Sequence, residues 1–306
     1  TIDGTELWIQ TTLSPIVDID GNIKNLIAID SDITEIKKAE EEISKQRNLL
    51  ELKNNLITDS IKYAKKIQEA LLPSTGTIKK HFKDSFVLFH PKDLVSGDFY
   101  WVAQKDSMTF LAEVDCTGHG VPGGFMSMIG NSLLSEIVNI KNVYEPEEIL
   151  CLMHQRLIES FNRNEDDNSQ EDGMDASIFC FNKSENSLKI ACANQDAYFI
   201  SDGKMQTIKG GHFSIGETTF KQNFRVSQTQ INVNQGDVLY LMSDGYQDQF
   251  GGPNNKKFMI KKLRELLYLI HKQEMKEQLT TLDEAFSEWK GDYKQIDDIL
   301  LIGIKF

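Results

Sequence analysis

The sequence predicts an α+β fold, and two patterns support that prediction. Short apolar and aromatic runs separated by turns recur from residue 85 onward: "SFVLFH", "FYWVAQ", "MTFLAEVD", "ASIFCFNKSENSLKIACA", "AYFISDG", "FRVSQTQINV", "VLYLMSD" and "ILLIGIKF". Because their connections are short, these runs favour mostly antiparallel strands. Amphipathic helical patterns lie near residues 123–140, 146–163, 256–272 and 274–290. Strands and helices grouped in blocks, rather than alternating, are typical of the α+β class.

Composition and charge exclude some classes of protein. The chain has 306 residues, 40% hydrophobic and 26% charged, which is an ordinary globular composition and length enough for two or more folding units. The formal net charge of −13 argues against a nucleic-acid partner, because a nucleic-acid groove needs a basic stripe. Some of the excess acid could instead hold a divalent metal.

The cysteines and the absence of targeting patterns favour a cytoplasmic protein. Four cysteines show no CxxC pairing, so neither a zinc site nor a disulfide framework is indicated. No stretch is long and apolar enough for a membrane span, and no signal peptide opens the sequence. Since Thr1 already lies in an expected strand, we expect this sequence to be a fragment of a longer protein. Whether a membrane or sensory segment lies upstream is left open.

Residues 1–35 are expected to form two strands joined by a turn at "DIDGN", where Asp-Gly supplies the backbone angles of a tight hairpin. A calcium loop is the alternative, but its glycine would stand one residue early and no bidentate Glu follows. A hairpin of this length cannot enclose a core, so it should end a larger sheet domain. The stretch "GNIKNLIAIDSDITEIKKAEEEI" resembles the last strands and exit of a PAS sensory domain.

Residues 36–72 are expected to form a helical linker that ends at Pro73. Apolar residues recur there every seven positions along one seam: Ile36, Ile43, Leu50, Ile57, Ala64 and Leu71. The companion positions Gln46, Lys53 and Ser60 are polar, so the pattern predicts a weak, coiled-coil-like homodimer that can shift register. The alternative is one helix packed on its own domain.

Four aspartates, each beside an apolar strand, indicate a divalent metal site: Asp98, Asp115, Asp244 and Asp297. Removing a carboxylate from water beside a buried strand costs on the order of several kcal/mol unless the carboxylate is paired or coordinates a cation. Oxygen-only ligation suits Mn²⁺ or Mg²⁺ better than zinc. Two such ions can activate water and polarise a phosphoryl oxygen, so phosphate ester hydrolysis is the expected chemistry.

The segment "DCTGHGVPGGFMSMIG" fits that chemistry. Its glycines allow the backbone to approach metal or phosphate closely, and a helix beginning near Gly123 would direct its positive end at an anion.

Five motifs together resemble the SpoIIE-type branch of the metal-dependent protein serine/threonine phosphatases (PPM family): "VSGDFYW", "DCTGHGVPGGFMSMIG", "EDGMDASI", "SDGYQDQFGG" and "DDILLIGI". The stretch "SIKYAKKIQEALLP" resembles the switch helix that enters the catalytic domain of that branch. The resemblance implies a phosphatase domain over residues 73–306, built as a two-sheet antiparallel β-sandwich flanked by helices, with a metal pair at one edge.

The resemblance also assigns ligands. It matches Asp98 to the bridging aspartate, Asp115 and the backbone carbonyl of Cys116 to the second motif, and Asp244 and Asp297 to the C-terminal ligands. Two Mn²⁺ or Mg²⁺ ions are implied.

The resemblance leaves the roles of four further residues open. Asp175 falls where an accessory ligand of a third ion would lie, or is a turn aspartate. Asp298 is expected to cap a turn or support the ligands rather than bind metal. His119 could act as general acid or contact substrate, although relatives can carry lysine there. Lys92 could contact the substrate phosphate, or is a solvated loop lysine.

Two segments depart from the family pattern. "ACANQDAYF" stands where "AGANNPLY" is usual, which changes Cys192, Gln195 and Asp196, and "GGHFSIGE" replaces a Pro-Ile-Gly turn. Gly124 stands where alanine is common, which should matter little. These changes leave the ligands intact but bear on substrate preference.

The resulting hypothesis is a Mn²⁺- or Mg²⁺-dependent phosphoserine/phosphothreonine protein phosphatase that uses metal-bound hydroxide for direct attack. An N-terminal sensor would regulate it through the helical linker, and the resemblance implies as substrate a phosphorylated STAS-type anti-sigma-factor antagonist. The alternatives are a catalytically silent dimeric signalling module that binds a partner protein, and a metal-dependent phosphodiesterase acting on a small nucleotide.

Overall fold

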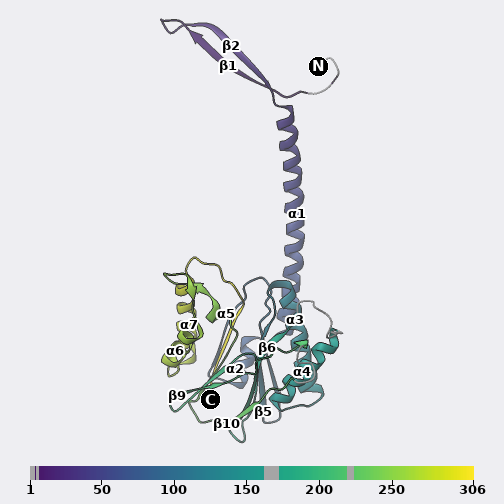
Figure 1. Cartoon of the computed structure of the whole chain (residues 1–306), viewed down its shortest axis with the longest axis vertical. Coiled ribbons are helices and arrows are strands. Elements are labelled where there is room, and N and C mark those ends of the chain that lie inside the picture. Colours follow the sequence, from purple (N-terminus) through teal and green to yellow (C-terminus); the bar gives the residue numbers. More distant parts are fainter. Residues whose placement is uncertain (1–3, 5–6, 162–171, 219–223) are drawn as a thin grey trace. The chain divides into compact units, whose positions relative to one another are not determined.

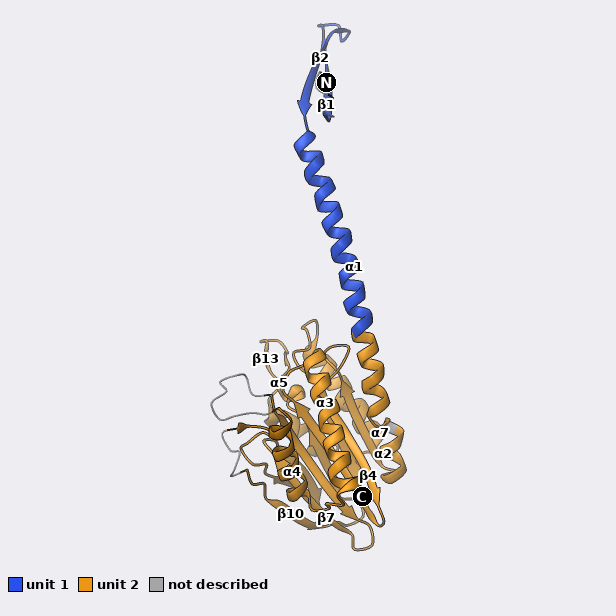
Figure 2. Ribbon diagram, turned by 90° about the vertical axis from the view of Figure 1, so that its right-hand side faces the viewer, with its two compact units in different colours: residues 1–60 blue, residues 61–306 orange. Residues whose placement is uncertain are grey.

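The structure is a computed structural model that describes residues 4, 7–161, 172–218 and 224–306. The chain divides into two compact units, Thr1–Ser60 and Ile61–Phe306. Figure 1 gives the order of the elements, and Figure 2 shows the two units in different colours. Each unit is described by itself.

The first unit consists of a hairpin and most of a long helix. Strands β1 (Ile9–Val17) and β2 (Ile23–Asp32) pair antiparallel around a turn in which Gly21 has φ +83°. Helix α1 (Thr34–Leu71) follows, and the Asp32 carboxylate accepts a hydrogen bond of 2.9 Å from the Thr34 N–H at its start. The hairpin and the helix lie where the sequence predicts them.

Two antiparallel five-stranded sheets form the second unit. The first sheet has the order β10-β7-β6-β5-β4, with bounds Gln228–Asn232, Ser187–Ala193, Met174–Asn182, Met108–Cys116 and Phe99–Lys105. The second has the order β3-β14-β11-β8-β9, with bounds Ser85–His90, Ile299–Lys305, Val238–Met242, Ala197–Ser201 and Lys204–Ile208.

Helices cover the outer faces of both sheets (Figure 2). Against the first sheet lie α3 (Gly120–Leu134), its continuation as a π-helical segment (Ser135–Ile140), and α4 (Pro146–Ser160). Against the second sheet lie α6 (Ile260–Ile270) and α7 (Met275–Lys290). The remaining elements are short: α2 (Thr75–His81), α5 (Gly245–Asp248), β12 (Phe250–Gly251) and β13 (Lys256–Lys257).

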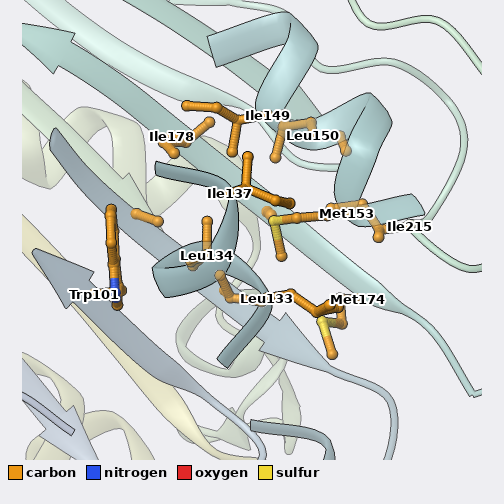
Figure 3. Packing of buried hydrophobic residues seen from close by; sticks show 14 of the residues in the cluster. Trp101, Leu133, Leu134, Ile137, Ile149, Leu150, Met153, Met174, Ile178 and Ile215 are labelled. Carbon is orange, nitrogen blue, oxygen red and sulfur yellow. The ribbon is translucent and has the colours of Figure 1, made fainter. Parts of the chain in front are cut away.

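Alternation along the strands divides the buried side chains among three cores. On β5, Phe110, Ala112 and Val114 face α3 and α4, whereas Leu111 faces the other sheet. Figure 3 shows the first of these cores, where Trp101 and Ile178 from the sheet meet Leu134, Ile149 and other helical residues. Because neighbouring strand residues point to opposite faces, an acid on the inner face must lie between the sheets.

The two-sheet α+β architecture is therefore confirmed. The sequence did not predict α2, α5, β9 or the β12–β13 pair, all of which are short, so they carry little periodic signal. The helix expected from residue 256 begins only at Ile260, after β13. Helix α4 ends at Ser160, and residues 162 and 163 of the expected helix lie outside the described residues. The strand expected from residue 224 begins only at Gln228. In the described part of the chain, no helix is long and apolar enough to cross a membrane.

Candidate active site

Strand register brings the acids of distant motifs to one end of the sandwich. Phe99 pairs with Val114, so Asp98 lies beside the end of β5, and Asp115 pairs directly with Asp175 at the start of β6. In the second sheet, β11 ends at Met242, just before Asp244, where the neighbouring β14 begins. Like charges directly opposite each other on paired strands are destabilising, so the repulsion between Asp115 and Asp175 has to be compensated by a further interaction.

Asp98 is the most informative of these acids. Its side chain is 2% exposed, and its Oδ2 is buried without a hydrogen-bond partner among the described residues. Burial raises the pKa of Asp98 well above its usual value, and the neighbouring Glu113 and Asp298 add to that shift, against the Ser243 hydroxyl. A buried carboxylate oxygen with no donor is costly unless a cation takes its place.

Asp115 and Asp244 are more accessible than Asp98 but belong to the same group of interacting acids. Burial raises the pKa of Asp115 well above its usual value, and the charges of Asp98 and Asp244 raise it further. Burial raises the pKa of Asp244, which precedes α5, to about 6, with Asp248 and Asp297 adding to the shift. The side chains of Asp98, Asp115, Asp244 and Asp297 therefore act on one another electrostatically.

A polar cavity of about 380 Å³ opens at this end of the sandwich. Its lining comes from both sheets and the turns beside them: Asp115, Asp175, Asn194, Gln195, Asp196, Tyr198, Met242, Ser243, Asp244, Gln247 and Ile260. The volume admits more than a phosphate group, so a substrate segment around the phosphate can enter as well.

Close backbone packing fixes the loop before Asp98 against the loop after Asp115. A Cβ placed on Gly123 would lie 2.2 Å from the Gly118 oxygen, and one on Gly97 would lie 2.5 Å from the same oxygen. Only glycine fits at these two positions. The sequence predicted that the backbone approaches metal or phosphate closely here. The structure shows that part of this close approach is between the two loops.

Asp298 secures the same loop from the other sheet. Its carboxylate accepts hydrogen bonds from the Lys92 N–H at 2.7 Å and from the Gly97 N–H at 2.8 Å. This supports the expectation that Asp298 holds a turn. The backbone of Lys92 thus has a structural contact, and among the described residues its side chain has no ion pair.

His119 lies at the start of α3 and is half-exposed. Its Nδ1 lies 2.7 Å from the Asp93 Oδ2, on the loop that precedes Asp98. Neither residue belongs to the cavity lining. The sequence did not single out Asp93, because an acid in an exposed loop gives no pattern of its own.

Asp175 is held by hydrogen bonds on both oxygens. The Ser214 hydroxyl donates to Oδ1 at 2.6 Å, and the Asn194 amide donates to Oδ2 at 2.9 Å. Both donors come from the two segments that depart from the family pattern. Asp175 is therefore an oriented acid at the cavity wall rather than a loose turn residue.

A second polar cluster, which the sequence did not predict, lies one layer deeper. Glu113 is fully buried, and its carboxylate accepts a hydrogen bond from the Gln195 amide. The same amide donates to the Ser177 hydroxyl at 3.0 Å. An isolated acid within the apolar run "MTFLAEVD" was the available signal, since a buried Glu requires partners.

Gln68 was also missed. It lies in the part of α1 that belongs to the second unit, is 5% exposed, and donates to the Ser96 oxygen at 2.6 Å and to the Ser127 hydroxyl at 2.7 Å. The signal was a polar residue on the otherwise apolar side of the helix beside Ala64 and Leu71.

These residues fit a divalent cation in their chemistry. The donors are carboxylate and backbone oxygens, and one oxygen of Asp98 is buried without a partner while Glu113 and Asp298 raise the pKa of this residue. Across the described residues, no three His, Cys, Asp or Glu side chains are grouped as a complete metal-binding set.

Comparisons with known proteins agree with this fold. The chain superposes on the SiaA-PP2C domain of Pseudomonas aeruginosa with a TM-score of 0.74 and 27% identity, covering 83% of this chain and 98% of that one. The PP2C phosphatase domain of SpoIIE from Bacillus subtilis, solved with a fragment of its regulatory domain, gives a TM-score of 0.56 at 17% identity, covering 73% and 63%. The RsbU and RsbW domains of a Mycobacterium tuberculosis protein give 0.56 at 15%, covering 72% and 59%.

A comparison with curated proteins gave no match. The family model for stage II sporulation protein E matches residues 105–306, which is most of the second unit. The chain therefore belongs to the SpoIIE family and carries its PP2C-type serine/threonine phosphatase domain.

Proposed function

We propose that this chain is a Mn²⁺- or Mg²⁺-dependent phosphoserine/phosphothreonine protein phosphatase of bacterial signalling. The observation that carries the proposal is the Asp98 carboxylate, buried among other acids with one oxygen unpartnered. Asp98, Asp115, Asp244, Asp297 and the Cys116 carbonyl would hold two ions. Asp175, oriented by Ser214 and Asn194, would support a third.

When bound, the ions supply a water nucleophile at neutral pH and polarise the phosphoryl oxygen. The chain itself orients the substrate: α3 begins directly after the Asp115 loop, so its N-terminal N–H groups are available to the phosphate oxygens. A thiol nucleophile is disfavoured, because burial raises the pKa of Cys180 and of Cys192 to about 12 and that of Cys116 well above its usual value. Direct attack without a phosphoenzyme is the consistent reaction.

Regulation through the helix is part of the proposal. Gln68 connects α1 to the Ser96 loop before Asp98 and to Ser127 on α3, so a shift of this helix would move both sides of the site. Upstream, apolar side chains along α1 are exposed, among them Ile43, Leu50 and Ile57. A homodimer through this seam, driven by a PAS-like sensor, would change the position of Gln68.

The partner proposed is a phosphorylated STAS-type anti-sigma-factor antagonist, met in the cytoplasm. It rests on the family, in which RsbU and SpoIIE domains are represented among the solved structures. All of the predicted metal ligands are present in the sequence, which argues against the silent dimeric module. The sequence has no nucleotide-binding motif, which argues against the phosphodiesterase.

Turnover measurements separate these functions. The full chain should hydrolyse a phosphoserine peptide in the presence of Mn²⁺ and leave a cyclic dinucleotide intact. Hydrolysis of the dinucleotide alone would favour the phosphodiesterase, and Mn²⁺ binding without turnover of either compound would favour the silent module.

A further inference from the structure

The turn after β7 presents an oriented carboxamide to the catalytic cavity. Gln195 lines the cavity beside Asp115 and Asp244. Behind it lies the fully buried Glu113, on the inner face of β5 two residues before Asp115, and Ser177, directly opposite Glu113 on β6. The cavity wall therefore has a second polar layer between the acidic site and the apolar core.

Hydrogen bonding determines which end of the Gln195 carboxamide points inward. Its Nε2 lies against the Glu113 carboxylate, the Glu113 main-chain oxygen at 3.4 Å, and the Ser177 hydroxyl at 3.0 Å. The main-chain oxygen only accepts hydrogen bonds, so the group facing it has to be the donating NH₂. The Ser177 hydroxyl in turn donates to the Cys192 sulfur at 3.3 Å, which leaves its oxygen as acceptor.

The carbonyl end of Gln195 then points away from this layer. Within the described part of the chain, Oε1 has no hydrogen-bond donor, and it is not among the fully buried polar atoms without partners. An accessible acceptor on a cavity-lining residue is available to a ligand. Most other oxygens of the lining belong to carboxylates that would be occupied by cations.

The backbone of the turn is fixed as firmly as the side chain. A Cβ on Gly210 would lie 2.1 Å from the Gln195 main-chain oxygen, so this segment leaves no space behind the turn. Asp196 accepts hydrogen bonds from the Gly210 N–H at 3.2 Å and from the Lys209 ammonium at 2.8 Å. A group held in this way loses little further entropy when it binds a ligand.

We propose that Gln195 is a substrate-binding residue whose Oε1 accepts a hydrogen bond from a main-chain N–H of the phosphoprotein beside the phosphoserine. Glu113 is the positioning residue that holds the carboxamide in this orientation. The inference rests on the phosphatase function proposed above. A substrate N–H that enters the cavity loses water and needs an acceptor, and Gln195 supplies a neutral one that does not compete for metal.

The test compares two substrates with the full chain and Mn²⁺: a phosphoserine peptide, which has main-chain N–H groups, and p-nitrophenyl phosphate, which has none. The readout is the ratio of kcat/KM for the peptide to kcat/KM for p-nitrophenyl phosphate. In Gln195→Met and in Glu113→Met we expect this ratio to fall roughly fivefold, through KM for the peptide, as for one lost hydrogen bond.

Glu113→Gln is the matched variant, because it keeps an acceptor oxygen for the Gln195 amide and should retain the ratio within about twofold. The double variant Gln195→Met/Glu113→Met should show no larger fall than either single variant, since both changes remove the same contact. Circular dichroism and calorimetric Mn²⁺ binding confirm that each variant is folded and loaded.

An unchanged ratio in Gln195→Met would overturn the inference while leaving the phosphatase function standing. A fall in Glu113→Gln as large as in Glu113→Met would overturn the positioning role. If Glu113→Met does not fold, Gln195→Met and Glu113→Gln still decide both points. Absence of turnover of both substrates by the wild-type chain would overturn the proposed function itself.

Discussion

Gln68 donates a hydrogen bond of 2.6 Å to the main-chain oxygen of Ser96, two residues before Asp98. The same amide donates to Ser127 on α3, and the Ser96 N–H donates back to the Gln68 Oε1 at 3.2 Å. One glutamine near the end of α1 therefore satisfies three polar groups on two sides of the acidic cluster. The end of α1 that belongs to the second unit is therefore mechanically connected to the loop before Asp98.

Replacing Gln68 should uncouple the helix from the site. Gln68→Ala leaves the main-chain N–H and oxygen of Ser96 without this partner, whereas the Ser127 hydroxyl keeps its hydrogen bond to the Gly124 oxygen; the cost is on the order of 1–3 kcal/mol. We expect a lower free energy of unfolding in urea and at least a several-fold loss of Mn²⁺-dependent turnover. Lys66→Ala, at an exposed position two residues earlier on α1, is the control. Turnover in Gln68→Ala equal to that of the control would show that the helix does not act through this contact.

Adjacent glycines at the start of α3 should differ sharply in their tolerance of a methyl group. In Gly123→Ala the new Cβ would meet the Gly118 oxygen at 2.2 Å, whereas in Gly124→Ala it would meet the Val95 side chain at 3.3 Å. Overpacking typically costs about 1–3 kcal/mol, and here it displaces the loop between Asp115 and α3. We expect Gly123→Ala to lose metal-dependent activity and Gly124→Ala to retain most of it. Initial rates for both variants check this, and equal rates would contradict the loop packing.

The metal-free protein should lose stability as pH rises through the titration of Asp244. Its pKa is raised from 3.8 to about 6 in the folded state, so between these values the folded state binds more protons than the unfolded state. The free energy of unfolding therefore falls as pH increases from about 4 to 6. Asp98 and Asp115, whose pKa values burial also raises, act in the same direction.

Urea unfolding in EDTA at pH 5 and pH 7 measures this effect. Asp244→Asn should show a smaller loss of stability between the two pH values than the wild type. Added Mn²⁺ should reverse the trend in the wild type, because cations bind the ionised carboxylates. The same pH dependence in wild type and Asp244→Asn would remove Asp244 from the cluster.

The exposed seam of α1 should determine the oligomeric state. Leu50 and Ile57 are 60% and 58% exposed, and a second copy of the helix would cover them. Sedimentation velocity should show a dimer for the wild type and a monomer for Leu50→Asp/Ile57→Asp. The matched control, Asn48→Asp/Asn55→Asp, adds the same charge on the opposite side of the helix and should remain dimeric. A wild-type monomer would contradict the proposed dimer.

Strand runs and helical periods were sufficient to predict the α+β class, and acidic strand ends to nominate candidate ligands, whereas the two-sheet sandwich was implied by the family resemblance. Each feature is local: alternation in "MTFLAEVD" reports one strand, and an aspartate beside it reports one buried charge. The antiparallel register of β4, β5 and β6 then brings Asp98, Asp115 and Asp175 together, as the family resemblance implied.

The supporting contacts could not be predicted, because they join residues distant in sequence whose types are individually common. Gln195 is 82 residues from Glu113, and Gln68 is 59 residues from Ser127. The His119–Asp93 pair joins two exposed loops in the same way. Only the packed sheets and helices determine which polar groups share a buried space.

Mn²⁺-dependent hydrolysis of a phosphoserine peptide by the wild-type chain and by Asp98→Asn tests the central claim most directly. The substitution keeps the shape of the buried side chain and removes the charge that the cation requires; Asp84→Ala, at an exposed position, is the control. We expect turnover that requires Mn²⁺, is retained in Asp84→Ala, and falls by more than about a hundredfold in Asp98→Asn. Full turnover in Asp98→Asn, or turnover of the wild type that is unaffected by EDTA, would contradict the metal-dependent phosphatase.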